Sequence, residues 1–183
     1  MLANLRVLFG RLVDIVLLRG GPESLPASLG MLAVTILLNV VVSAVVVALI
    51  PTAPAFSVLE MIVSIVVPLL WFQVAFALAK KPERFVQTMV AFFGVNMLFQ
   101  PLVAPMFAAL LPYFAKADPT LPPPAALSLL FLAITAWLMI VWVRIVHAAF
   151  EWPYVAAIVF VFAQNFFTFV VYAAVFGAAA DKV

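Results

Sequence analysis

The residues of this chain best placed to do chemistry are amide side chains inside long apolar segments, because a polar group in lipid costs free energy unless it finds a partner. Five amides inside such segments are the candidates for a polar interior, namely Asn39, Asn96, Gln100, Gln164 and Asn165. Asn96 and Gln100 are four residues apart, which places both on one face of a helix. Two interpretations stay open: the amides line a polar cavity or substrate path, or they hold neighbouring helices together by hydrogen bonds.

Glu60 is the only carboxylate well inside one of these apolar segments. It sits about one turn from the expected start of its helix, which corresponds to a depth of about 6–8 Å at 1.5 Å per residue. A proton-coupled transporter would favour a carboxylate near the membrane midplane. We therefore expect an interfacial, helix N-terminal position, where the helix dipole favours a negative charge.

A second group of polar residues follows the fourth apolar segment. Arg144, His147 and Glu151 are spaced by three and four residues, so they would share one helix face. Together with three basic residues of an earlier turn they form a candidate cytoplasmic contact face: Lys80, Lys81, Arg84, Arg144, His147 and Glu151. The face is interpreted as a docking surface or pH-sensitive salt bridge, or as an ordinary interfacial cluster with Arg144 reaching toward headgroups.

Residue usage argues against catalysis and against bound cofactors. There are no cysteines and a single histidine, His147, which removes disulfides, thiolate ligands and bis-histidine haem ligation within one chain. No nucleophile elbow, zinc-protease helix or phosphate-binding glycine loop is present in the sequence. The sequence predicts no enzyme, no catalytic residue, no metal site and no cofactor. A net charge of +2 without a dense basic patch predicts no nucleic-acid partner.

The composition requires that lipid cover much of the surface. Of the residues, 69% are hydrophobic and 9% charged, against about 45–50% and about 25% in soluble domains. Five apolar runs follow the N-terminal region, at about 28–50, 56–79, 85–113, 125–143 and 154–177. Each is long enough for a helix to cross the membrane, which takes about 20 residues. We predict an all-α, polytopic bundle of about five transmembrane helices over residues 20–183.

The first nineteen residues are predicted to form an amphipathic helix. Its apolar face comprises Leu5, Leu8, Phe9, Leu12, Ile15 and Val16. With three arginines, the helix suits an anionic membrane surface, and the alternative is a cap packed against the bundle. Gly20-Gly21-Pro22 is expected to end this helix, and Ser24 or Ser28 to cap the next one. In the third run, Pro101 and Pro105 predict either a kink or a re-entrant break.

The basic residues predict the orientation in the membrane. Seven of the nine lie before the first run, between the second and third, or after the fourth: Arg6, Arg11, Arg19, Lys80, Lys81, Arg84 and Arg144. By the positive-inside rule the N-terminus is cytoplasmic and the C-terminus lies outside. The Ala-, Val-, Leu- and Pro-rich composition is typical of a bacterial protein, so we expect the bacterial inner membrane.

Local features of the chain resemble the Yip family, the Ypt/Rab-interacting five-span membrane proteins, in a bacterial form. Gly21-Pro22 is similar to the family's Gly-Pro entry motif before the first span. The segment 84–88, leading to Gly94 and Pro101, resembles its third span, in which a basic lead-in precedes a glycine and a proline.

The link between the last two spans completes this resemblance, through an expected short polar turn after Trp137 that contains Arg144 and His147. The resemblance implies a cytoplasmic N-terminus and a non-enzymatic membrane adaptor. We therefore expect a scaffold, adaptor or accessory subunit that acts through helix–helix and membrane-surface contacts. Its expected partners are anionic lipid and another membrane protein or a second copy. The alternative is a small transporter or channel component with a polar intramembrane cavity.

Overall fold

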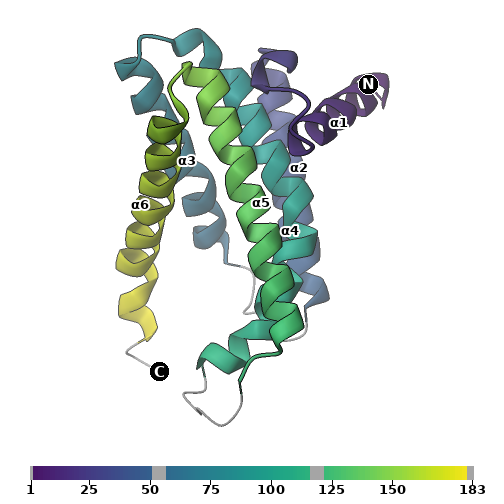
Figure 1. The fold of residues 1–183 in the computed structure, drawn as a ribbon, viewed down its shortest axis with the longest axis vertical. Coiled ribbons are helices and arrows are strands. Elements are labelled where there is room, and N and C mark those ends of the chain that lie inside the picture. Colours follow the sequence, from purple (N-terminus) through teal and green to yellow (C-terminus); the bar gives the residue numbers. More distant parts are fainter. Residues whose placement is uncertain (1, 51–56, 116–121, 181–183) are drawn as a thin grey trace.

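The chain folds as an all-helical bundle (Figure 1). The computed structural model describes residues 2–50, 57–115 and 122–180. The helices are α1 (Leu2–Val16), α2 (Leu29–Leu49), α3 (Val58–Leu78), α4 (Phe85–Ala115), α5 (Ala125–Phe150) and α6 (Tyr154–Ala180). Helices α2 to α6 are each long and apolar enough to cross a membrane; α2 alone, with 21 residues, spans about 31 Å. The prediction of five spans and a shorter N-terminal helix is confirmed, and the chain is an integral membrane protein.

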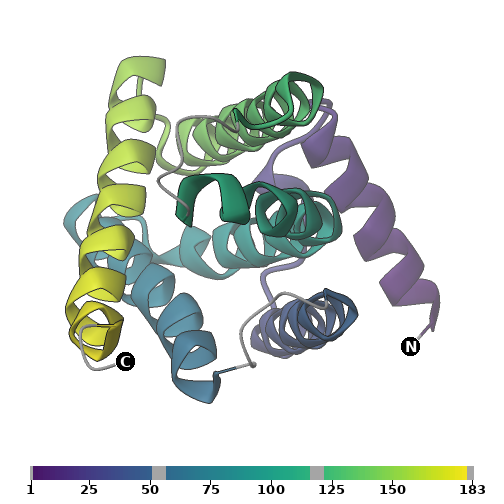
Figure 2. The same ribbon diagram turned by 90° about the horizontal axis from the view of Figure 1, so that it is seen from below.

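Helix α4 forms the centre of the bundle. It packs against α1, α2, α3 and α5, and Figure 2 shows these helices arranged around it. Residues 88–95 of α4 are all buried, although elsewhere the bundle exposes one side of each helix. Ala91 and Gly94 lie in this buried stretch, and small side chains let neighbouring helix backbones approach closely. The most buried part of the core therefore lies in the first half of α4.

Helix α1 lies across the other helices rather than along them (Figures 1 and 2). Its side chains Leu8, Leu12 and Ile15 are fully buried against the bundle. Leu12 covers Gly94, where an added Cβ would lie 2.5 Å from Leu12 Cδ2. The α1 helix therefore packs as a cap against the bundle.

The remaining surface of α1 carries apolar and charged side chains together. At 100° per residue, the exposed Arg6 lies beside Phe9 and Val13 on one flank of the buried face. On the other flank, the exposed Val7 lies between Arg11 and Asp14. The structure therefore shows α1 as a cap on the bundle, and its contact with an anionic membrane surface stays a prediction.

The connection between α1 and α2 follows the expected turn chemistry. The helix ends before Gly20, and Pro22–Ser24 forms a single 3₁₀ turn. Ser28 caps α2 by accepting a hydrogen bond from the Met31 backbone N–H at 3.4 Å. Ser24 instead donates its hydroxyl proton to the Gly21 carbonyl at 2.8 Å. Of the two candidate caps, Ser28 is the one that the structure uses.

Two helices differ from the expected segments. Helix α5 continues past residue 143 to Phe150, so the expected polar turn with Arg144 and His147 is wrong, and both residues lie in its last turns. Helix α5 continues because basic side chains from the turn between α3 and α4 bond its final carbonyls. Helix α4 continues through Pro101 and Pro105 to Ala115, and its last turns bend away from its axis (Figures 1 and 2). The prolines therefore bend the helix without making it re-entrant. Residue 56, the expected start of the second span, lies outside the described residues.

Candidate functional site

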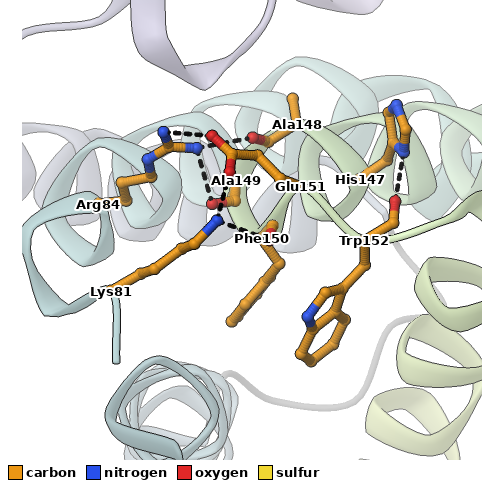
Figure 3. Close-up of polar contacts among 8 residues, drawn as sticks. All are labelled: Lys81, Arg84, His147, Ala148, Ala149, Phe150, Glu151 and Trp152. Atoms are coloured by element: carbon orange, nitrogen blue, oxygen red, sulfur yellow. Dashed lines mark hydrogen bonds and ion pairs between the residues drawn. The ribbon is translucent and has the colours of Figure 1, made fainter. Parts of the chain in front are cut away.

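The C-terminal end of α5 is held by two basic side chains from the turn between α3 and α4. A helix leaves its last four backbone carbonyls without intrahelical partners. Lys81 Nζ donates to the Phe150 carbonyl at 3.0 Å, and Arg84 Nη1 donates to the Ala148 and Ala149 carbonyls at 3.2 and 3.3 Å (Figure 3). Cations at this end of a helix also complement its dipole. The two side chains thus satisfy the carbonyls that keep α5 helical beyond the expected boundary.

Glu151 joins the same two cations. It has a left-handed backbone conformation, with φ of 57°, directly after the last residue of α5. Its carboxylate accepts hydrogen bonds from Lys81 Nζ and Arg84 Nη2, both at 2.6 Å (Figure 3). We call Lys81, Arg84 and Glu151 the clamp. It connects the α3–α4 turn to the α5–α6 turn at one end of the bundle, which we call the basic end.

The clamp also changes the acidity of its carboxyl group. Hydrogen bonds from Lys81 and then Arg84, together with the charges of both residues, lower the pKa of Glu151 below its ordinary value of 4.5. The Glu151 side chain is 59% exposed, and exposed ion pairs contribute little net stability because water and salt screen them. The larger structural effect of Lys81 and Arg84 is therefore the capping of α5.

The other residues of the expected contact face point elsewhere. His147 Nδ1 lies 2.6 Å from the Trp152 carbonyl, which can only accept, so this nitrogen carries the proton and donates it. The His147 ring also stacks on Tyr154 at 4.0 Å between ring centres. Arg144 Nη2 donates to the Leu18 carbonyl at 3.3 Å, next to the end of α1. Glu151 has a left-handed backbone directly after α5, so its side chain points away from Arg144 and His147. The helical spacing alone did not indicate this.

Arg144 and His147 line a hollow between the connection that follows α1 and the end of α5. It has a volume of about 310 Å³, and its charged and aromatic lining comes from Arg19, Glu23, Arg144, His147 and Tyr154. Lys80, the remaining residue of the expected face, is exposed and has a left-handed backbone with φ of 55°. The six expected residues therefore all lie at the basic end, but on two sides of it.

A polar cavity of about 260 Å³ lies in the opposite half of the bundle, between α2, α3, α4 and α6. Its polar lining includes Asn39, Ser43, Glu60, Ser64, Gln100 and Tyr172. Asn39 lies at the midpoint of α2 and Gln100 at the midpoint of α4, whereas Glu60 is in the first turn of α3. The cavity therefore extends from one end of the bundle to about half its depth.

Several lining groups are already bonded, and two are not. The Glu60 backbone N–H donates to Ser57 Oγ at 3.3 Å, and Tyr172 donates its hydroxyl proton to the Glu60 carbonyl at 3.1 Å. Within the described residues, Asn39 Oδ1 and Gln100 Oε1 are buried and receive no hydrogen bond. Glu60 has the helix N-terminal position that the sequence predicted. Two residues that line the cavity thus have amide oxygens that lack donors.

The other three amides do not line this cavity. Gln164 Nε2 donates to Thr168 Oγ1 at 3.3 Å, and Asn165 Nδ2 donates to the Val161 carbonyl at 2.8 Å, both within α6. Asn96 is half-buried in α4, one turn nearer the basic end than Gln100. Two of the five predicted amides therefore meet in one site. Tyr172 was missed because a tyrosine near a helix end is usually read as an interfacial anchor.

An apolar groove opens between α3 and α6. Its volume is about 660 Å³, and aromatic side chains from both helices and from the α5–α6 turn line it: Trp71, Trp152, Phe160 and Phe167. The Trp71 indole N–H is buried and, in the part of the chain that the structure describes, has no acceptor. In a membrane protein such a groove faces lipid or another protein.

The fold and these sites define a class of protein, a five-span helical membrane protein with a short N-terminal helix packed across the bundle. No family model, no curated protein and no solved structure matches the chain.

Proposed function

We propose that this protein is a non-enzymatic membrane scaffold, adaptor or accessory subunit, which holds a partner membrane protein through its basic end and its outer helix faces. The observation that carries the proposal is the clamp. Lys81 and Arg84 each bond both the end of α5 and Glu151, so two turns distant in sequence form one unit. Such a unit presents its exposed charges in fixed positions, as a specific docking surface requires.

The orientation follows from the same charges. With the basic end in the cytoplasm, α1 would lie at the inner membrane surface, and its exposed Arg6 and Arg11 would attract anionic lipid. The proposed orientation has the N-terminus in the cytoplasm, and the proposed location, based on the composition, is the inner membrane of a bacterium. The resemblance to the Yip family supports the same orientation and the same class of function.

The groove between α3 and α6 supplies a contact surface within the membrane. Aromatic side chains such as Trp71 and Phe167 are only partly covered by this chain. A transmembrane helix of the partner would cover these aromatic side chains. The partner thus meets the protein both in the membrane and at its cytoplasmic surface.

The test is purification of the tagged full-length protein from its native host in mild detergent, with mass spectrometry of the proteins that accompany it. We expect one membrane protein at a fixed ratio. A charge-reversal variant, Lys80→Glu with Glu83→Lys, should lose that partner, because both residues are exposed at the basic end and neither belongs to the clamp.

A matched control adds a charge at the other end of the bundle. Ala126→Glu changes an exposed residue in the first turn of α5, where a carboxylate suits the helix dipole. It should leave the partner bound. The proposal would be wrong if the wild-type protein purified alone, or if the control and the charge-reversal variant lost the partner equally.

The alternative function, a small transporter or channel component, is favoured by the polar cavity. The bundle beneath the cavity is filled by an aromatic core that includes Phe72, Phe76 and Phe92, and ring contacts at 5.4–6.4 Å connect them. A solute would therefore have to displace this core in order to cross. Flux into reconstituted vesicles that is lost in Gln100→Leu, but retained in Gln164→Leu, would support transport over scaffolding.

A further inference from the structure

We infer that the polar cavity binds a small cation of charge +1, either an alkali metal ion or a small protonated amine. The inference does not depend on the proposed scaffold function. The cavity holds one carboxyl group, Glu60, and two buried amide oxygens without donors, Asn39 Oδ1 and Gln100 Oε1. Residues of three elements, α2, α3 and α4, thus bring oxygen-bearing side chains around a common space of about 260 Å³.

The two amide oxygens are the strongest part of this case. Asn39 is only 7% exposed, and a buried acceptor without a donor destabilises a protein by about 1–3 kcal/mol. Buried polar atoms in folded proteins are nearly always bonded to protein, water or ligand. Gln164 and Asn165 show the usual solution in this chain, since each donates its amide protons to its own helix. Asn39 Oδ1 and Gln100 Oε1 have no donor within the described residues, and both residues line the cavity.

The chemistry of the lining selects the charge of the ligand. Oxygen ligands from carboxylate, amide and hydroxyl groups suit hard cations. Ser43 and Ser64 add hydroxyl oxygens to the same lining. Glu60 is the only titratable carboxyl group among the lining residues, so an ion of charge +1 is neutralised and one of charge +2 is not. An ammonium group fits equally, because its three N–H donors match one carboxylate and two amide oxygens.

The cavity begins near the ends of α2 and α3 and reaches to about half the depth of the bundle. Val47 and Ser57 line its outer part, and they lie next to the ends of α2 and α3. Asn39 lies deeper, eight residues along α2 from Val47, or about 12 Å at 1.5 Å per residue. The negative end of α2 and the positive end of α3 meet near this mouth and offset each other. The Glu60 carboxylate therefore sets the sign of the field.

The experiment measures binding to the full-length protein in lipid nanodiscs. Thermal unfolding would be followed in sodium, potassium or methylammonium chloride, with N-methylglucamine chloride keeping the ionic strength constant. A ligand that binds the folded state raises the unfolding temperature in a concentration-dependent way. We expect saturable stabilisation by at least one of the three small cations, and the one that works distinguishes a metal ion from an amine.

Variants assign the effect to the cavity. Glu60→Gln and Asn39→Leu should each weaken the apparent affinity at least tenfold. Gln164→Leu is the matched control, since it removes a buried amide that lies outside the cavity, and its affinity should equal that of the wild type. Ser43→Cys provides a second readout that does not rely on stability, because the chain has no other cysteine. The cation should slow the reaction of this thiol with a methanethiosulfonate reagent.

The inference would be overturned if none of the three cations changed the unfolding temperature of the wild-type protein or the reactivity of the thiol in Ser43→Cys. It would equally be overturned if Glu60→Gln and Asn39→Leu retained the wild-type affinity. Either result would leave the partner-binding experiment unaffected, so the two proposals fail independently.

Discussion

Replacing Gly94 should separate α1 from the bundle in proportion to the size of the new side chain. A Cβ at this position would lie 2.5, 2.7 and 3.2 Å from three atoms of Leu12. Ordinary carbon contacts begin near 3.5 Å, so Leu12 must move by about 1 Å. In Gly94→Ala this movement costs about 0.5–1.5 kcal/mol if Leu12 leaves its rotamer, and the gain in helix propensity of about 1 kcal/mol offsets it. Gly94→Leu adds three more carbons, for which overpacking costs about 1–3 kcal/mol.

The assay uses the absence of native cysteines. A single Ile15→Cys reporter, buried in α1 at 1% exposure, should react slowly with a maleimide in nanodiscs. It should react slowly in Gly94→Ala and quickly in Gly94→Leu. Adding Leu12→Ala to Gly94→Leu makes room for the new side chain and should restore slow reaction. Equal reactivity in all four backgrounds would refute the docking of α1 at Gly94, and failure of the Leu12→Ala rescue would refute the steric explanation.

Three further predictions concern the clamp and the polar residues. Because the pKa of Glu151 is lowered in the folded state, its stabilising contribution is present above pH 4.5 and is lost as the pH falls through the lowered value. Thermal unfolding of wild type and Glu151→Gln should therefore differ at pH 7 and converge in acid. Tyr172→Phe removes the hydrogen bond to the Glu60 carbonyl and should reduce the free energy of unfolding by about 0.5–1.5 kcal/mol, measured by denaturation in mixed micelles. Gln164→Leu should change it by no more than about 0.6 kcal/mol, because in the described part of the chain the Gln164 side chain bonds only to Thr168 of its own helix.

The helices were predictable because the apolar runs are long and uninterrupted by charge. Chain breaks were also predictable where a residue acts locally, as with Gly20-Gly21-Pro22 and the Ser28 cap. The end of α5 was not predictable in this way. Its last turn is stabilised by Lys81 and Arg84, which are more than 60 residues away in the sequence. A pattern within one helix contains no information about a cap supplied by another turn.

The candidate sites show the same division. Spacing correctly put Asn96 and Gln100 on one helix, yet only Gln100 lines the cavity, because that depends on how α2 and α3 pack against α4. Likewise, the expected single face with His147 and Glu151 assumed that the helix continues through residue 151. The left-handed conformation of Glu151 redirects its side chain toward Arg84. Tertiary packing therefore decided which of the predicted polar residues came together.

Helix α5 is longer than a membrane crossing requires, and the position of its polar residues suggests which part is embedded. From Arg144 back to the start of α5 is about 28 Å, which is close to the hydrocarbon thickness of about 30 Å. We therefore expect the apolar run that ends at residue 143 to be the embedded part of α5. The remaining turns to Phe150 are the ones whose last carbonyls Lys81 and Arg84 bond, so the clamp extends α5 beyond the length that its apolar run accounts for.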